Sequence, residues 1–154
     1  MTTLLPGNIA PLFSLPASNG KTVSLKKLVG KKVILYFYPK DDTPGCTKEA
    51  CGFRDLISEI KMAGAEVFGV SPDSVESHQA FIKKFGLTFP LLADTDKTVA
   101  NAYGAWGENI IRDKKRIGII RMTFLIDETG KIEKIWPQVQ PEDHPDEVLR
   151  AIKD

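Results

Sequence analysis

The chain has 154 residues, of which 42% are hydrophobic and 27% are charged, and these proportions are ordinary for a globular domain. Its 21 basic and 20 acidic side chains leave a formal charge of +1, so no broad field attracts nucleic acid or an anionic membrane surface. No apolar run approaches the roughly 18 residues of a membrane span, so we expect neither nucleic acid nor membrane among its partners.

Apolar periodicity and turn signals predict a hairpin followed by alternating strands and helices. In chain order, the sequence predicts a hairpin over 13–25, a central strand over 33–38, a helix from 43 to 64, a strand over 66–70, a helix from 73 to 85, a short strand or loop over 89–92, a short helix over 96–103, a charged loop over 104–116, a strand over 117–127, a turn over 128–131, a strand over 132–139 and a helix from 145 to 153.

Four local signals set these boundaries. Asn19-Gly20 is a hairpin turn signal, and the run 33–38 is apolar on both faces, as in a central strand. Thr43 suits the N-cap of a helix and Pro44 its first position. Asp73, with an acidic residue three positions later, resembles a capping box. The order of elements indicates an α/β domain over residues 1–154, in which a central mixed sheet is flanked by helices.

The N-terminus has no basic segment followed by an apolar one, so a cytoplasmic location is the default expectation. In a reducing cytosol, two cysteines rarely form a permanent disulfide. Cys46 lies at the expected start of the helix after the central strand, where free backbone N–H groups and the helix dipole stabilise a thiolate. Strand-to-helix loops in α/β sheets also face ligands, so we expect a thiol that is both reactive and accessible.

Cys51 lies five residues after Cys46, which places their Cα atoms roughly 8.6 Å apart in an ideal helix. A disulfide needs Cα atoms within about 7 Å, so the two cysteines bond only if the first helical turns unwind. From spacing alone, a redox switch and two small buried helix residues are both consistent with this pattern. A metal site is disfavoured, because His78 and His144 show no ligand-like spacing to the cysteines.

The residues around Cys46 resemble a known family. Pro39, Thr43 and Cys46 match the active-site pattern of peroxiredoxins, and the stretch 36–51 is similar to the bacterioferritin comigratory protein branch, also called peroxiredoxin Q. Further similarity lies at 103–107 and 121–127, so the resemblance covers nearly the whole chain. One departure is Asn109, where a lysine is expected.

The resemblance implies a thioredoxin-like fold and a role for each matching residue. Cys46 is then the peroxidatic cysteine, and Thr43 offers its hydroxyl to the thiolate and the peroxide oxygens. Pro39 shields the pocket from water. Arg121 places a guanidinium beside the thiolate, and its charge in an apolar run argues against a merely solvated residue. Cys51 matches the resolving position.

Glu49 is either a partner for this guanidinium or a solvated helix residue. The implied reaction converts a hydroperoxide to an alcohol and water, with recycling of a Cys46–Cys51 disulfide by a thioredoxin-like reductant. It requires no metal, haem or flavin, and a monomer is the expected state.

Two rival functions remain. A thiol–disulfide oxidoreductase on the same fold would need a C-x-x-C pair, which this chain lacks. A non-enzymatic redox sensor or holdase module would switch through the same disulfide but react with peroxide once.

Overall fold

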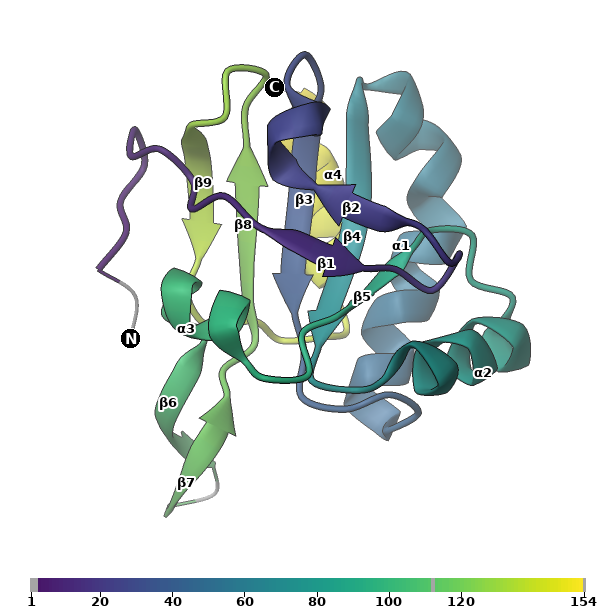
Figure 1. Cartoon of the computed structure of the whole chain (residues 1–154), viewed down its shortest axis with the longest axis vertical. Coiled ribbons are helices and arrows are strands. Elements are labelled where there is room, and N and C mark those ends of the chain that lie inside the picture. The colour runs from purple at the N-terminus through teal and green to yellow at the C-terminus, as the bar shows by residue number, and fades with distance from the viewer. Residues whose placement is uncertain (1–2, 112, 154) are drawn as a thin grey trace.

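The computed structural model describes residues 3–111 and 113–153. The side chains of residues 109–111 lie outside the description, and these include Asn109, the residue that departs from the family pattern. Within the described residues a five-stranded sheet has the order β5-β4-β3-β8-β9. β3, β4 and β5 run parallel, whereas β8 and β9 pair antiparallel, so the expected mixed sheet is confirmed (Figure 1). The elements are β1 (Ser14–Pro16), β2 (Thr22–Ser24), a 3-10 turn η1 (Leu25–Leu28), β3 (Lys32–Phe37), α1 (Pro44–Met62), β4 (Ala65–Ser71), α2 (Val75–Phe85), β5 (Leu91–Ala93), α3 (Thr98–Tyr103), β6 (Trp106–Ile111), β7 (Lys114–Ile119), β8 (Met122–Ile126), β9 (Ile132–Trp136) and α4 (His144–Lys153).

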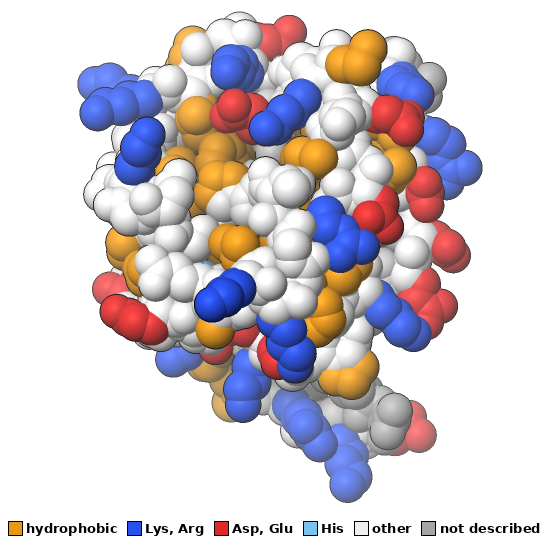
Figure 2. Space-filling model, turned by 90° about the vertical axis from the view of Figure 1, so that its right-hand side faces the viewer, with side chains coloured by type: hydrophobic (Ala, Val, Ile, Leu, Met, Phe, Trp, Pro, Cys, Tyr) orange, Lys and Arg blue, Asp and Glu red, His pale blue; other side chains and the backbone are white. Residues whose placement is uncertain are grey.

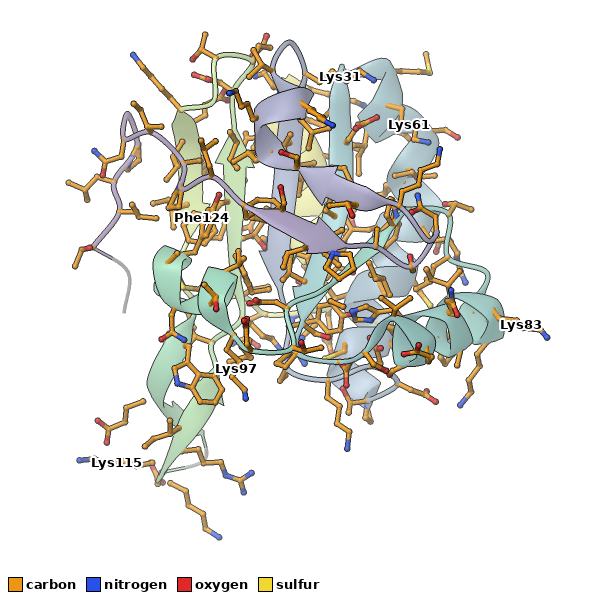
Figure 3. All side chains as sticks on the ribbon, in the orientation of Figure 1. Lys31, Lys61, Lys83, Lys97, Lys115 and Phe124 are labelled. Carbon is orange, nitrogen blue, oxygen red and sulfur yellow. The ribbon has the colours of Figure 1, made fainter. Side chains whose placement is uncertain are left out.

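The sheet carries a hydrophobic cluster on each face, because side chains alternate along β3. Leu35 and Phe37 point to the face covered by the β1–β2 hairpin and α3, where Phe124 also packs (Figure 3). Ile34 and Tyr36 point to the opposite face, which α1 and α4 cover. This arrangement is the three-layer architecture expected from the sequence.

The β6–β7 hairpin corrects the charged loop predicted over 104–116. β6 and β7 pair antiparallel from Trp106–Ile119 to Ile111–Lys114 and project from the body (Figure 1). Lys114, Lys115 and Arg116 are exposed, so this strand pair lacks the apolar alternation that marks a half-buried strand. Its tip turns at Asp113, which has a positive φ of 64°.

The strand predicted over 117–127 is interrupted at Ile120 and Arg121, where β7 ends and β8 begins. Ile120 N–H donates to the carbonyl of Ala105, and the carbonyl of Arg121 accepts from Val139 N–H. The backbone of these two residues therefore belongs neither to the β6–β7 pairing nor to the β3–β8 pairing. The last strand is also shorter than predicted, because β9 ends at Trp136.

The surface matches the near-neutral composition. On the face shown in Figure 2, basic and acidic side chains are interspersed over the body, while basic ones gather at the projecting hairpin. Among the described residues, the 19-residue helix α1 is too polar to cross a membrane, and the other helices are shorter than a membrane span.

Candidate active site

Cys46 lies in the first turn of α1, just after the loop that leaves the central strand β3. Pro44 occupies the start of the helix, as predicted. The first N–H groups of α1 have no helical partners, so this end of the helix favours a negative charge on sulfur. The expected accessibility of Cys46 is wrong, because only 1% of its surface is exposed. A reactant must therefore reach the sulfur past the groups that cover it.

Arg121 is the group in direct contact with this sulfur. Its Nη2 atom lies 3.1 Å from Cys46 Sγ, and its side chain is 21% exposed. The contact follows from strand register, since Met122 of β8 pairs with Phe37 at the end of β3. The residue before Met122 therefore lies next to the loop that leads to Cys46. The structure thus places Arg121 beside the thiol, and its catalytic role stays a prediction.

Glu49 contacts the other terminal nitrogen of the Arg121 guanidinium. Of the two alternatives left open by the sequence, it is therefore the partner of Arg121 and not a solvated helix residue. Its Oε1 atom lies 3.3 Å from Arg121 Nη1, and the residue is 1% exposed. Burial raises the pKa of Glu49 to about 8, and the charge of Arg121 offsets part of that rise. Within the described residues, Glu49 Oε2 and Tyr36 Oη are buried without a hydrogen-bond partner.

The raised pKa of Glu49 predicts a pH-dependent stability. The folded chain keeps a proton on Glu49 up to about pH 8, whereas the unfolded chain releases it near the ordinary value of 4.5. The free energy of unfolding should therefore fall as the pH rises through this window. Replacing Glu49 by Gln removes this titration, so the variant should lose less stability between about pH 5 and pH 8 in urea denaturation. Glu128→Gln, in the exposed turn before β9, is the matched control and should follow the wild type. Parallel pH profiles for Glu49→Gln and wild type would contradict the assignment.

Thr43 occupies the N-cap of α1, as predicted, although its side chain makes no capping hydrogen bond. Its hydroxyl instead donates to the carbonyl of Lys40 at 2.9 Å. The oxygen lone pairs of Thr43 therefore stay available to accept a hydrogen bond from another molecule. Pro39 is exposed and precedes Lys40 in the same loop. Both predicted residues thus belong to the loop before Cys46.

Cys51 is half-buried on the same helix, and both cysteines are free. α1 is continuous from Pro44 to Met62, so the spacing of an intact helix applies to them. At roughly 8.6 Å between Cα atoms, they are too far apart to bond in this conformation.

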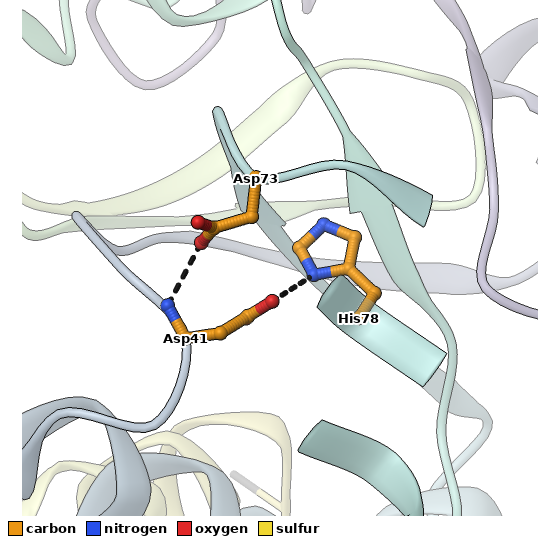
Figure 4. A group of neighbouring side chains, drawn as sticks. All are labelled: Asp41, Asp73 and His78. Carbon is orange, nitrogen blue, oxygen red and sulfur yellow. Dashed lines mark hydrogen bonds and ion pairs between the residues drawn. The ribbon is translucent and has the colours of Figure 1, made fainter. Parts of the chain in front are cut away.

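The sequence missed a buried polar cluster beside this loop. Asp41, Asp73 and His78 place one potential ligand atom each within 4.8 Å of one another, so His78 has carboxylate neighbours, although the group includes no cysteine (Figure 4). Hydrogen bonds already join these groups: Asp73 Oδ2 accepts from Asp41 N–H at 2.8 Å, and Asp41 Oδ2 contacts His78 Nδ1 at 2.7 Å. The capping role predicted for Asp73 is wrong, because Ser74 caps α2. No pattern of spacing links residue 41 to residue 78, so sequence alone could not have found the cluster.

A surface cavity of about 370 Å³ lies against the first turn of α1. Pro44, Gly45 and Lys48 line one side, and residues 140–143 line the other. A methyl group placed on Gly45 would lie 2.8 Å from Arg121 Nη2 and 3.5 Å from Pro141 Cγ. The guanidinium therefore lies close behind one wall of this cavity.

Known proteins resemble this chain over nearly its full length. The family model described as "AhpC/TSA family" matches residues 6–135. A Coxiella burnetii homologue named peroxiredoxin Bcp is 54% identical over 93% of this chain and 95% of its own. Peroxiredoxin Bcp of Escherichia coli K12 is 45% identical over 100% of this chain and 99% of its own.

Solved structures agree with this similarity. Xanthomonas campestris peroxiredoxin Q superposes with a TM-score of 0.87 at 38% identity, over 99% of this chain and 96% of that one. A cysteine-to-serine variant of Xylella fastidiosa PrxQ superposes with a TM-score of 0.92 at 36% identity, over 99% and 98%. The thioredoxin-like fold expected from the sequence is therefore confirmed.

Proposed function

Because the chain belongs to the AhpC/TSA family of peroxiredoxins, we propose that it reduces hydroperoxides at Cys46 and is reset through a disulfide with Cys51. At the coarser level the family defines it as a thiol-dependent peroxidase. The observation that carries the assignment to Cys46 is the 3.1 Å contact between its sulfur and Arg121 at the start of α1.

In the first step, the Cys46 thiolate attacks one peroxide oxygen and the O–O bond breaks. Sulfur becomes a sulfenic acid, and the departing oxygen takes a proton to leave as alcohol or water. Arg121 stabilises the thiolate and then the negative charge that moves onto the departing oxygen. Thr43 supports the same step, since its hydroxyl oxygen can accept from the peroxide O–H while it donates to Lys40.

The cavity beside α1 is the proposed approach for the substrate. It lies against Gly45, one residue before Cys46, and Arg121 lies behind that wall. The bacterioferritin comigratory protein of Xanthomonas campestris is 37% identical over 99% of this chain and 98% of its own, and its structure is described in terms of alkyl peroxide reduction activity. We extend this substrate class to the present chain, together with hydrogen peroxide.

In the second step, the Cys51 thiol condenses with the sulfenic acid, which forms the disulfide and releases water. A dithiol reductant of the thioredoxin kind then reopens the disulfide by exchange. One hydroperoxide and two thiol equivalents give one alcohol and one water. The step requires that α1 unwind around Cys46, because an intact helix holds the cysteines too far apart.

The close approach of Gly45 to Arg121 gives a prediction for the first step. Gly45 has no positive φ, so alanine fits the helix, but its methyl would lie 2.8 Å from Nη2 and push the guanidinium away from Cys46. We expect Gly45→Ala to slow oxidation of Cys46 in the same direction as Arg121→Ala. The latter should cost at least about tenfold, the effect of losing a charge-assisted contact of about 1.4 kcal/mol. Stopped-flow measurement of the peroxide step tests both variants. Gly118→Ala is the matched control, because Gly118 has no positive φ and a methyl group added there lies within 4 Å of no atom outside its chain neighbours. An unchanged rate in both active-site variants would leave Arg121 a structural residue.

Turnover number separates this proposal from the sensor alternative. A small amount of protein is mixed with excess hydrogen peroxide, thioredoxin, thioredoxin reductase and NADPH. An enzyme consumes many peroxide molecules per Cys46, whereas a sensor or holdase consumes one and then stops. A single equivalent consumed in the presence of reductant would favour the sensor.

A further inference from the structure

The loop that precedes α1 is held by a buried polar cluster centred on Asp41, which is 7% exposed (Figure 4). The carboxylate of Asp41 accepts a hydrogen bond from Tyr38 Oη at 2.5 Å and another from Ser77 Oγ at 2.8 Å. His78 Nδ1 lies 2.7 Å from the same carboxylate, and the backbone N–H of Asp41 donates to Asp73 Oδ2 at 2.8 Å. Groups from the end of β3, the β4–α2 turn and α2 therefore converge on one residue of the loop.

His78 connects this loop residue to the sheet. It is 0% exposed, and its Nε2 atom lies 2.9 Å from the carbonyl oxygen of Leu92 in β5. A carbonyl only accepts, so Nε2 carries a hydrogen, and a further proton must lie between Nδ1 and Asp41 Oδ2. Both ring nitrogens are engaged, so the ring has one orientation in which all its polar groups are satisfied.

The position of Asp41 determines where the neighbouring residues of the loop lie relative to Cys46. The preceding residue, Lys40, provides the carbonyl that accepts the hydroxyl hydrogen of Thr43. Pro39 lies one residue further back in the same loop. A loop fixed at Asp41 therefore fixes where the Thr43 hydroxyl points, whereas Arg121 and the start of α1 reach Cys46 through separate contacts.

We propose that Asp41 and His78 are positioning residues for the peroxide step, which act by holding the loop that orients Thr43. Neither residue touches the sulfur or takes part in bond making. The inference rests on the proposed peroxidase function of Cys46. It separates two properties of the site. Arg121 and the start of α1 stabilise the thiolate of Cys46, whereas the loop that holds Thr43 orients the peroxide.

Two substitutions at residue 78 separate the two contacts of the ring. In His78→Asn, the amide nitrogen takes the place of Nδ1 and keeps a donor toward Asp41. In His78→Gln, the amide reaches the place of Nε2 and keeps the contact with Leu92 but loses the one with Asp41. Lys84→Ala is the matched control, because the exposed Lys84–Asp42 ion pair also joins α2 to the loop.

Two rates are measured for each variant in single-turnover experiments. Oxidation of Cys46 by hydrogen peroxide requires the Thr43 geometry, whereas alkylation by iodoacetamide requires only a thiolate and access. A misplacement on the order of 1 Å can cost about 100-fold, so a partly released loop should slow peroxide oxidation by roughly tenfold in His78→Gln. Alkylation should stay within about twofold of wild type, and His78→Asn and Lys84→Ala should both oxidise at nearly the wild-type rate.

Equal peroxide rates in the Asn and Gln variants, whether both slow or both fast, would overturn the proposal. So would alkylation that slows in parallel with oxidation, since that indicates loss of the thiolate or of the fold. If neither His78 variant folds, Ser77→Ala carries the test, because it removes one donor to Asp41 from a half-buried position. Slower oxidation with unchanged alkylation then supports the proposal, and unchanged oxidation overturns it. Failure of the proposed function is a distinct result, in which wild-type Cys46 itself does not react with peroxide.

Discussion

Replacing Cys46 by serine should abolish peroxide reduction while the protein stays folded. A serine hydroxyl is not ionised near neutral pH, so the contacts from Arg121 and the start of α1 have no thiolate to stabilise. We expect turnover to fall by at least about 1,000-fold, which corresponds to about 4 kcal/mol of activation free energy. Peroxide consumption with a thioredoxin system measures the loss.

Two controls make this result specific to Cys46. The serine is nearly isosteric with the buried cysteine, so circular dichroism and the thermal midpoint should change little. Cys51→Ser should still reduce one equivalent of peroxide, since it retains Cys46 and Arg121, but should not form the intramolecular disulfide. Appreciable turnover in Cys46→Ser would show that another group is the nucleophile.

Oxidation should unwind the first turns of α1. In the reduced structure one continuous helix carries both cysteines, and its geometry keeps their Cα atoms roughly 8.6 Å apart, beyond the reach of a disulfide. The N-terminal turns are the weakest part, because their first N–H groups lack helical partners and glycines at 45 and 52 each cost about 1 kcal/mol relative to alanine. Unwinding should therefore extend over residues 44–52.

Phe53 marks where the unwinding should end. This residue is 0% exposed and stacks on Tyr36 at 4.8 Å between ring centroids, so releasing it would open the core beneath α1. Burying a phenylalanine side chain contributes about 1.5–3 kcal/mol, which holds the rest of the helix in place. Before α1, the contacts of Asp41 with Ser77 and His78 of α2 should hold the preceding loop in place.

Hydrogen exchange measures this change directly. After one equivalent of peroxide, amides of residues 46–52 should exchange faster, while those after Phe53 keep their protection. Cys51→Ser should show no such change, and a dithiol should restore the wild-type pattern. If oxidised wild type kept full protection across these residues, the two cysteines would not be intramolecular partners, and an external thiol would have to resolve Cys46.

The main elements around the site were predictable because their signals are local. The apolar run over 33–38 indicated β3. Pro44 and the helical spacing of the apolar residues after it indicated α1. Arg121 was identified by the resemblance to peroxiredoxins, and its charge within an apolar run supported that identification because a buried charge requires a partner. Its partners at Cys46 and Glu49 lie 75 and 72 residues away in sequence, so the identity of those contacts depends on the pairing of β8 with β3.

Features that depend on contacts between distant elements were not predictable from the sequence. The charged strand β7 forms because it pairs with β6, not because of an apolar pattern of its own. The burial of Cys46 results from packing rather than from residue type. Asp41 resembles any loop aspartate until α2 brings His78 to it, 37 residues later. The bond from the Thr43 hydroxyl to Lys40 is local, by contrast, but no residue-type signal distinguished it from a capping bond to α1.

Mapping the oxidation products by mass spectrometry tests the central claim most directly. Reduced wild type and Cys51→Ser are each treated with one equivalent of hydrogen peroxide, alkylated, and digested. Wild type should yield a disulfide between Cys46 and Cys51 within one chain, with a loss of two hydrogens. Cys51→Ser should instead carry one added oxygen on Cys46. Oxidation confined to any residue other than Cys46, or a wild-type chain that retains both free thiols after the peroxide has been consumed, would contradict the account.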